Sequence, residues 1–524
     1  MKSGSPGRLS LPDVSSLLVI DYGSQYTRLI VRRLRDRRFY AHLCTPDQAR
    51  QAITGPGLAG VVLSGGPGTV AQSYDPGLID DIFARSLPVL GICLGAQMLC
   101  HHFDGTVESR DEASEFGESI LQVDPANPSL LHVTNDHRLM SWMSHSDYVA
   151  TLGESCQTLA MTSDGYCAAF QVQDRPIFGL MFHPEVSHTQ KGTEILAAFA
   201  GQVCGCKASW QAGQQNQRLI DTIRTQVGEG RVLTAFSGGI DSLVVGVLVH
   251  RAIGERGINV FVDTGLLRQD DLAFIDTIQA ETGLQIDQID AQDVFIKRLA
   301  GVSDPEEKRK IIGRTFIEVF TDHVRGLGPF SHLAQGTLYT DIIESGGASG
   351  AHTIKSHHNV GGLPQELGFE LLEPLKELYK DEVRELGVSL GIDRQFVRRH
   401  PFPGPGLAVR VLGALDAQTI DIARQVDALF IEALRYHDLY DKVWQAFAVL
   451  TPLRSVGVVG DQRAMGYVCA LRAVTSVDGM TAQAAMLPAD FLTNITNKIC
   501  NRIPQIGRVV YDYTSKPPGT IEWE

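Results

Sequence analysis

The clearest structural signal in the chain is Val232-Leu-Thr-Ala-Phe-Ser-Gly-Gly-Ile-Asp-Ser242, which is followed by an apolar run to Ile253. A short β-prone run, two glycines and an apolar segment of helical length predict a strand over 232–236, a tight turn and a helix over 241–253. A further apolar run predicts a strand over 258–262. Together these elements form one βαβ unit with a right-handed crossover, which indicates a parallel sheet.

The turn in this unit is a candidate anion site. Its glycines let the backbone approach a bulky anion, and the N–H groups at the start of the helix attract it. Ser237 and Ser242 add hydroxyl donors. Asp241 would repel a phosphate unless a divalent cation lay between them, so the pattern implies Mg²⁺ held mostly by water and phosphate oxygens. The alternative is a glycine turn with an aspartate near the helix N-cap.

Toward the N-terminus, residues 17–205 alternate between predicted strands and helices, which indicates an α/β sandwich with a parallel core. Within it, Gly91-Ile-Cys93-Leu-Gly95-Ala-Gln97 follows a predicted strand. Small residues two places before and after the cysteine permit a sharp strand-to-helix turn that exposes the sulfur. The helix dipole favours a thiolate there, and backbone amides can stabilise an oxyanion. For an isolated cysteine the alternative is a small buried apolar residue.

A thiol nucleophile needs a base, and His183-Pro-Glu185 follows the predicted strand over 177–182. Residues two apart in an extended segment point to the same side, so the carboxylate can orient the imidazole. Ser64-Gly-Gly-Pro67, after another strand, is a candidate second oxyanion element.

Composition narrows the class of protein. The chain has 524 residues, of which 44% are hydrophobic and 20% are charged, so it is neither disordered nor a disulfide-stapled miniprotein. A net charge of -14 argues against nucleic-acid binding, and we interpret the basic segment 28–38 as a solvated helix face. No apolar run approaches a membrane span. Nine cysteines without dense spacing, and no secretory signal, favour free thiols in the cytoplasm.

Two composition shifts divide the chain. Residues 204–217 are polar and rich in glutamine, which is typical of a linker, and His400-Pro-Phe-Pro-Gly-Pro-Gly406 forbids continuous helix or sheet. The remaining residues, with a predicted helix over 417–436, indicate an α+β domain. The predicted organisation is a disordered extension over 1–16 and three domains over 17–206, 207–400 and 401–524.

The first domain resembles the class I glutamine amidotransferase family, on the Ser64, Cys93 and His183 motifs in that order. The resemblance implies that Cys93 forms a glutamyl thioester, with His183 as its base and Glu185 as the orienter. It also implies an oxyanion hole and a glutamine site, and hydrolysis of glutamine to glutamate and ammonia. The residues implied for the hole and the glutamine site are Gly66, Leu94, Gln97, Ser144 and His145.

The glycine turn of the second domain resembles the PP-loop of N-type ATP pyrophosphatases, which have a Rossmann-like parallel sheet and adenylate a carbonyl oxygen. Asp263, at the end of the next strand, is then a nucleotide contact, although a turn-forming aspartate is the alternative. The residues implied for ATP and pyrophosphate binding are Ser237, Gly238, Gly239, Ile240, Asp241, Ser242 and Leu243.

Residues 17–524 as a whole resemble the glutamine-hydrolysing GMP synthase family. The motifs that carry this resemblance include Asp21-Tyr-Gly-Ser-Gln, Lys308-Arg-Lys-Ile-Ile-Gly-Arg314 and the tail Lys516-Pro-Pro-Gly-Thr-Ile-Glu-Trp-Glu524. It implies that a C–N ligase makes GMP from xanthosine monophosphate (XMP), ATP and glutamine, and forms a homodimer through the C-terminal domain. The residues implied for XMP are Arg314, Arg399, His400, Lys516 and Glu522, and those of a mobile lid are Lys355, His357 and His358.

The resemblance adds an expectation about charge, and alternatives remain for the lid segment and for the whole chain. Arg399, His400 and Lys516 are expected to supply positive charge, with Lys516 on a flexible tail. The lid segment could instead be a solvated loop with incidental histidines. The chain could also be another PP-loop amidotransferase, such as one that makes NAD from its deamido precursor, or a catalytically silent binding protein.

Overall fold

The computed structural model describes residues 15–109, 115–126, 130–131, 137–339, 341, 368–459, 461–476, 479 and 481–524. Residues 1–14, which include most of the extension expected to be disordered, lie outside the described part. The chain divides into two compact units, and the boundary falls between Gln211 and Ala212. Among the described residues, no helix combines the length and apolar character needed to cross a membrane.

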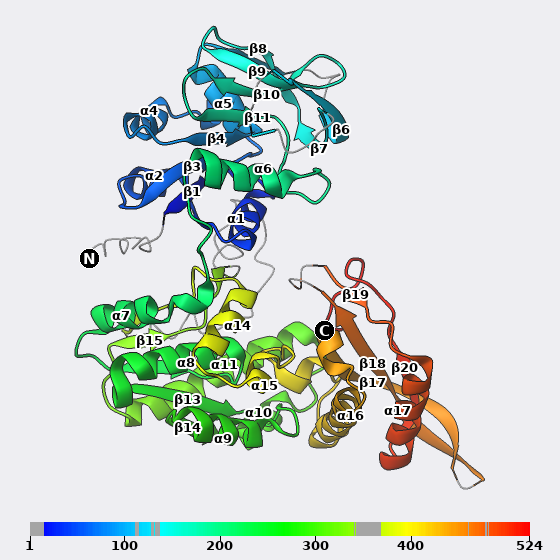
Figure 1. The fold of residues 1–524 in the computed structure, drawn as a ribbon. Helices are drawn as coiled ribbons and strands as arrows, with labels where there is room; N and C mark the ends of the chain where they lie inside the picture. Colours follow the sequence, from blue (N-terminus) through cyan, green and yellow to red (C-terminus); the bar gives the residue numbers. More distant parts are fainter. Residues whose placement is uncertain are drawn as a thin grey trace. The chain divides into compact units, whose positions relative to one another are not determined.

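The first unit is built on a nine-stranded sheet (Figure 1). Five strands form the predicted parallel part, in the order β2 (Tyr40–Cys44), β1 (Ser16–Ile20), β3 (Leu58–Leu63), β4 (Val89–Ile92) and β11 (Ile177–Leu180). Antiparallel strands extend it in the order β10 (Cys167–Val172), β9 (Cys156–Met161), β6 (Glu115–Val123) and β7 (Arg138–His145). Strands β1, β3 and β4 are almost wholly apolar and buried because helices cover both faces of a parallel sheet.

Helices of the first unit begin close to the predicted positions. Helix α1 (Thr27–Asp36) follows β1, and α5 (Leu94–His102) follows β4. A small separate sheet pairs β5 (Thr106–Ser109) with β8 (Asp147–Thr151). Helix α6 (Gly192–Ala198) follows the segment that carries His183.

The segment 204–217 is packed, although its composition predicts a linker. Trp210 is buried, and its ring centroid lies 4.4 Å from that of Tyr40. Cys206 is also buried, and helix α7 (Asn216–Val227) begins within the same segment. The aromatic ring of Trp210 buries a large apolar area, and this burial holds the polar segment against the first unit.

The second unit contains the predicted parallel sheet, in the order β14 (Ile286–Asp290), β13 (Gly257–Asp263), β12 (Val232–Ala235), β15 (His332–Ala334) and β16 (Glu370–Leu372). Helix α8 (Ile240–Ile253) connects β12 to β13, as the βαβ pattern predicts. Because β12 is the first strand in sequence and lies between β13 and β15, the strand order reverses beside it. Ligands of open α/β sheets bind at the carboxyl end of such a switch point.

The C-terminal part of the second unit combines helices with a mixed sheet, as expected. Strands β17 (Gln445–Val459) and β18 (Gln462–Thr475) form a long hairpin, and β19 (Gln483–Ala484) and β20 (Ile506–Tyr511) both pair with β18 (Figure 1). Helices α16 (Ala417–Tyr436) and α17 (Ala489–Arg502) pack on this sheet. One hydrophobic core includes residues of both the parallel sheet and this part, among them Leu233, Phe295, Phe430 and Leu450.

Candidate active site

Cys93 lies on the sharp turn that the glycine spacing predicts. Its backbone has φ 47° and ψ -108°, a left-handed conformation that side chains rarely adopt. A Cβ atom at Gly91 would lie 2.6 Å from the Ala96 nitrogen, and one at Gly95 would lie 2.3 Å from the Leu63 oxygen. Only glycine therefore fits on either side of the cysteine, and the turn holds the sulfur at the start of α5.

A buried thiol, imidazole and carboxylate meet at this turn. The Cys93 sulfur lies 3.3 Å from Nε2 of His183, and Nδ1 of His183 lies 2.7 Å from Oε1 of Glu185. Burial alone would lower the pKa of His183, but its contacts with the Cys93 sulfur and Glu185 outweigh burial and raise the pKa to about 11. The three groups have the order of nucleophile, base and orienter that acyl transfer requires.

The loop Ser64–Pro67 lies beside the thiol. A Cβ atom at Gly65 would be 3.5 Å from Cβ of Cys93 and 3.4 Å from Cε1 of His183. At Gly66 it would be 2.2 Å from the Tyr22 oxygen and 3.1 Å from Cδ2 of Leu94.

Hydrogen bonds from Cys93 N to Leu180 O (2.8 Å) and from Gly95 N to Ser64 O (3.1 Å) fix the backbone on both sides of Leu94. Gly66 and Leu94, the two residues predicted for the oxyanion hole, lie next to each other, and Leu94 directly follows Cys93.

Gln97 and His145 are buried in the same unit, and Ser144 is half-buried next to His145 on β7. Gln97 donates from Nε2 to the carbonyl of Asp147 at 3.0 Å, which ties α5 to the chain just after β7. Burial, followed by the charge of His183, lowers the pKa of His145 to about 4, so its imidazole is neutral near pH 7.

The predicted phosphate loop is held in shape by its own serines. The two hydroxyl oxygens of Ser237 and Ser242 lie 3.1 Å apart, and Ser242 Oγ accepts from Ser237 N at 3.2 Å and donates to Gly239 O at 3.0 Å. Gly238 has φ +74°, a conformation that favours glycine. The loop lies at the carboxyl end of β12, and therefore at the switch point of the sheet.

Lys380 is a residue of this site that the sequence analysis missed. It begins helix α14 (Lys380–Ser389), and its Nζ pairs with Oδ2 of Asp241 in the loop. A lysine is unfavourable at the positive end of a helix, so its position in the first turn was a signal that it serves a nearby anion.

The residues around Asp241 also fit a phosphate-bound Mg²⁺. Oδ1 of Asp241 is buried and has no hydrogen-bond partner. Across the described ranges no group of three or more His, Cys, Asp or Glu side chains could hold a metal by itself. Mg²⁺ commonly uses one or two carboxylates together with phosphate and water oxygens, so one free carboxylate oxygen suits it.

Asp263 is the buried last residue of β13. One oxygen of its carboxylate accepts from Gly265 N at 2.9 Å, and the other accepts from Gln292 Nε2 at 2.8 Å. Burial raises the pKa of Asp263. These bonds are those of a turn-forming aspartate, the alternative considered from the sequence, and the nucleotide contact of Asp263 stays a prediction.

The residues expected to bind XMP have different surroundings within the second unit. Arg314 is exposed on α11 (Pro305–Gly326), while Arg399 pairs with Asp271. The expected positive charge at His400 is wrong: its ring stacks 3.7 Å from that of Tyr440, and burial lowers its pKa to about 4. The lid residues Lys355, His357 and His358 lie outside the described residues.

The C-terminal tail is anchored, although it was expected to be flexible. Lys516 donates from Nζ to the Gly479 carbonyl at 2.9 Å, and its backbone pairs with Ala482. Glu522 accepts hydrogen bonds from the fully buried Arg410 and from Gln445. Buried cations need compensating partners, and the tail supplies them.

The two sites and their sheets define the class of protein: a class I glutamine amidotransferase joined to an ATP pyrophosphatase-like unit. Three family descriptions match, namely Glutamine amidotransferase class-I over residues 18–203, Phosphoadenosine phosphosulfate reductase domain over 231–311 and GMP synthase C terminal domain over 432–523.

Relatives named GMP synthase [glutamine-hydrolyzing] match almost the whole chain. That of Zymomonas mobilis is 45% identical over 97% of this chain and 98% of its own. Those of Alkalilimnicola ehrlichii (47%; 97% and 98%) and Thermosipho africanus (46%; 98% and 100%) are similarly close. The chain belongs to the GMP synthase [glutamine-hydrolyzing] family.

Among solved structures, that of a putative GMP synthase subunit from Thermoplasma acidophilum is 28% identical. The match covers 37% of this chain and 96% of the solved one, with a TM-score of 0.34.

Proposed function

We propose that this chain is a carbon–nitrogen ligase that converts XMP, ATP, glutamine and water to GMP, AMP, pyrophosphate and glutamate. The observation that carries the proposal is the contact of Cys93, His183 and Glu185 at 3.3 and 2.7 Å, in a chain that also holds a preformed phosphate loop. An ammonia source and an adenylating site together specify amination of an activated oxo group.

In the glutaminase reaction, His183 accepts the proton of the Cys93 thiol, and the sulfur attacks the amide carbon of glutamine. The amides of Gly66 and Leu94 bind the oxyanion, which is usually the largest single source of stabilisation in acyl transfer. His183 then gives its proton to the departing ammonia, and water hydrolyses the thioester to glutamate. Glu185 stabilises the imidazolium through Nδ1, while Gln97, Ser144 and His145 contact glutamine.

In the second unit, the loop 237–243 binds the pyrophosphate portion of ATP through its amides and its two serine hydroxyls. A carbonyl oxygen of XMP attacks the α-phosphorus, pyrophosphate leaves, and ammonia displaces AMP from the adenylyl-XMP intermediate. Asp241 is the residue that would help to hold Mg²⁺, which would supply charge neutralisation for the phosphates of ATP. Lys380 is suited to neutralise phosphate charge from the first turn of α14.

For XMP we propose Arg314, Arg399, Lys516 and Glu522, on the positions that match the family motifs. Arg399 and Glu522 have partners within the protein, Asp271 and Arg410, which a nucleotide would have to replace or share. His400 contributes as a neutral stacked ring. Lys355, His357 and His358 belong to the proposed lid.

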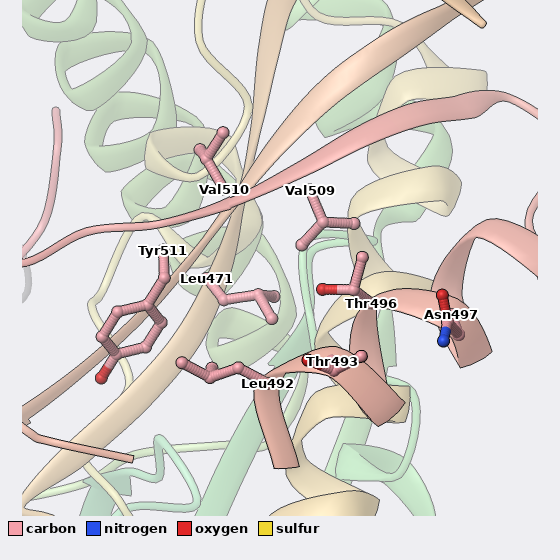
Figure 2. A pocket seen from close by; sticks show the side chains of 8 residues that line it. All are labelled: Leu471, Leu492, Thr493, Thr496, Asn497, Val509, Val510 and Tyr511. Carbon is pink, nitrogen blue, oxygen red and sulfur yellow. The ribbon is translucent and has the colours of Figure 1, made fainter. Parts of the chain in front are cut away.

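We also propose domains over 17–206, 207–400 and 401–524 and a homodimer formed by the last of them. The hairpin β17–β18 exposes apolar side chains, including Val458 at 75% and Met465 at 58%. A hollow of about 300 Å³ between α17 and β20 lies in the same C-terminal part of the second unit (Figure 2). Its lining residues are Leu471, Leu492, Thr493, Thr496, Asn497, Val509, Val510 and Tyr511. The nine free cysteines support a cytoplasmic location.

The test of the proposed function is product formation by the purified full chain. With XMP, ATP and magnesium present, GMP should form with glutamine and also with an ammonium salt as the nitrogen donor. Absence of GMP with both donors would overturn the proposal. Sedimentation of the full chain and of Val458→Glu tests the dimer separately.

A further inference from the structure

One face of helix α1 contacts the segment that carries the catalytic histidine and glutamate. Tyr26, the residue just before the helix, places its ring edge-on against His183, with centroids 4.9 Å apart and planes at 72°. Seven residues later, Arg33 donates from Nε to the carbonyl oxygen of Glu185 at 3.1 Å. A spacing of seven is about two helical turns, so both residues lie on the same side of α1.

The same segment is held from its other side by β7. His183 N donates to the carbonyl of Trp142 at 3.0 Å. Thr189 Oγ1 donates to the carbonyl of His183 and accepts from Trp142 N at 3.0 Å. The main chain of residues 183–185 is therefore fixed between a strand and a helix, while Tyr26 is the contact from α1 that reaches the imidazole itself.

We propose that Tyr26 and Arg33 are positioning residues of the glutaminase reaction. The ring of Tyr26 packs at the side of the imidazole and restricts its rotation away from the Cys93 sulfur. Arg33 fixes the backbone of Glu185 and so the distance between the carboxylate and Nδ1. This inference rests on the proposed function of the thiol site.

The glutaminase reaction needs the base within hydrogen-bond reach of the sulfur. A displacement of about 1 Å in a catalytic group can cost about 100-fold in rate. The titratable groups that face His183 among the described residues include Cys93, Glu185 and His145, and the Tyr26 phenol ring lies beside them. The Tyr26 ring packs against the imidazole by contact of the two rings, so its removal acts on the geometry of the site.

The experiment compares Tyr26→Leu with Tyr26→Phe, and Arg33→Met with Arg32→Met, in the full chain. Arg32 is the matched control because it lies on the same helix and pairs with Asp36 at 2.9 Å. We expect Tyr26→Leu and Arg33→Met to lower kcat for glutamine-dependent GMP formation by about tenfold, with little change in KM. Tyr26→Phe keeps the ring and Arg32→Met keeps the clamp, so both should resemble the wild type.

Two further readouts separate positioning from general destabilisation. Ammonium-dependent GMP formation should be unchanged in all four variants. The rate of Cys93 alkylation by iodoacetamide, measured from pH 5 to 10, should show a shifted midpoint in Tyr26→Leu and Arg33→Met only. An unchanged alkylation profile, or an equal loss with ammonium, would overturn the inference. A wild type that makes GMP with ammonium but never with glutamine would instead refute the proposed glutaminase reaction.

Discussion

The thiol site of the first unit and the nucleotide end of the second unit are built by different means. At the thiol site, steric requirements at Gly91, Gly95 and Gly66 fix the backbone, and the reacting side chains are short or rigid. In the second unit, the serines of the loop 237–242 hold its backbone in the same way, but the long cationic side chains pair with carboxylates far away in the sequence, as Lys380 does with Asp241 and Arg399 with Asp271. Short motifs thus specify backbone geometry, whereas partners of long charged side chains depend on the whole fold.

Removal of the Cys93 thiol should have the largest effect of the changes considered, and it should affect the first site alone. Cys93→Ala should abolish glutamine-dependent GMP formation, by about 10⁴-fold or more, because no other group can form the thioester. Ammonium-dependent activity should remain, since the second unit does not need the sulfur. Steady-state GMP formation, measured with glutamine and with an ammonium salt, gives the two activities. A parallel loss of both activities would contradict the expectation that the two sites work separately.

A substitution in the phosphate loop should instead lower activity with both nitrogen donors. Asp241→Ala should lower GMP formation by about 100-fold or more with either donor, because it removes the buried Oδ1 and leaves Lys380 without its partner. Exchange of labelled pyrophosphate into ATP should fall in parallel. Alkylation of Cys93 is the internal control and should keep its wild-type rate; retained exchange would exclude the loop from ATP chemistry.

The sequence predicts the parts of the fold that depend on local pattern. The turn at Cys93 follows from two glycines, the βαβ unit follows from apolar runs, and the helix 417–436 has the predicted bounds. Contacts between distant segments were not predictable. Lys380 meets Asp241 across 139 positions, and Arg33 meets Glu185 across 152. Neither the periodicity nor the spacing of residues in the sequence predicts such pairs. The C-terminal tail was expected to be flexible for the same reason, because its partners lie far away in the sequence.

A third prediction concerns the buried charges that anchor the tail. Lys308 is fully buried on α11, and its Nζ lies 2.6 Å from Oε2 of Glu524. Lys308→Met or deletion of Glu524 should destabilise the second unit by about 3–5 kcal/mol, because each leaves a buried charge or polar group unpaired. Denaturant unfolding measures the change. Lys310→Met, at an exposed position on the same helix, is the matched control and should change stability little.

The smallest expected effect is a dependence of stability on pH at His400. Burial lowers the pKa of this group from about 6.5 to about 4 in the folded chain. The neutral ring is accommodated above pH 6.5 in both states, but between pH 6.5 and 4 only the unfolded chain gains a proton. The stability of this region should therefore fall as the pH falls through that window, by about 3 kcal/mol at its lower end.

The variant His400→Gln isolates this contribution because glutamine can still donate to the Tyr440 carbonyl, which the imidazole contacts at 2.9 Å. Hydrogen exchange of peptides covering residues 394–445 would be measured at several pH values in both proteins. The difference between them should be smallest near pH 7 and grow toward pH 4, with the wild type losing protection faster. Equal losses of protection would show that His400 carries a proton in the folded chain, as the sequence led us to expect.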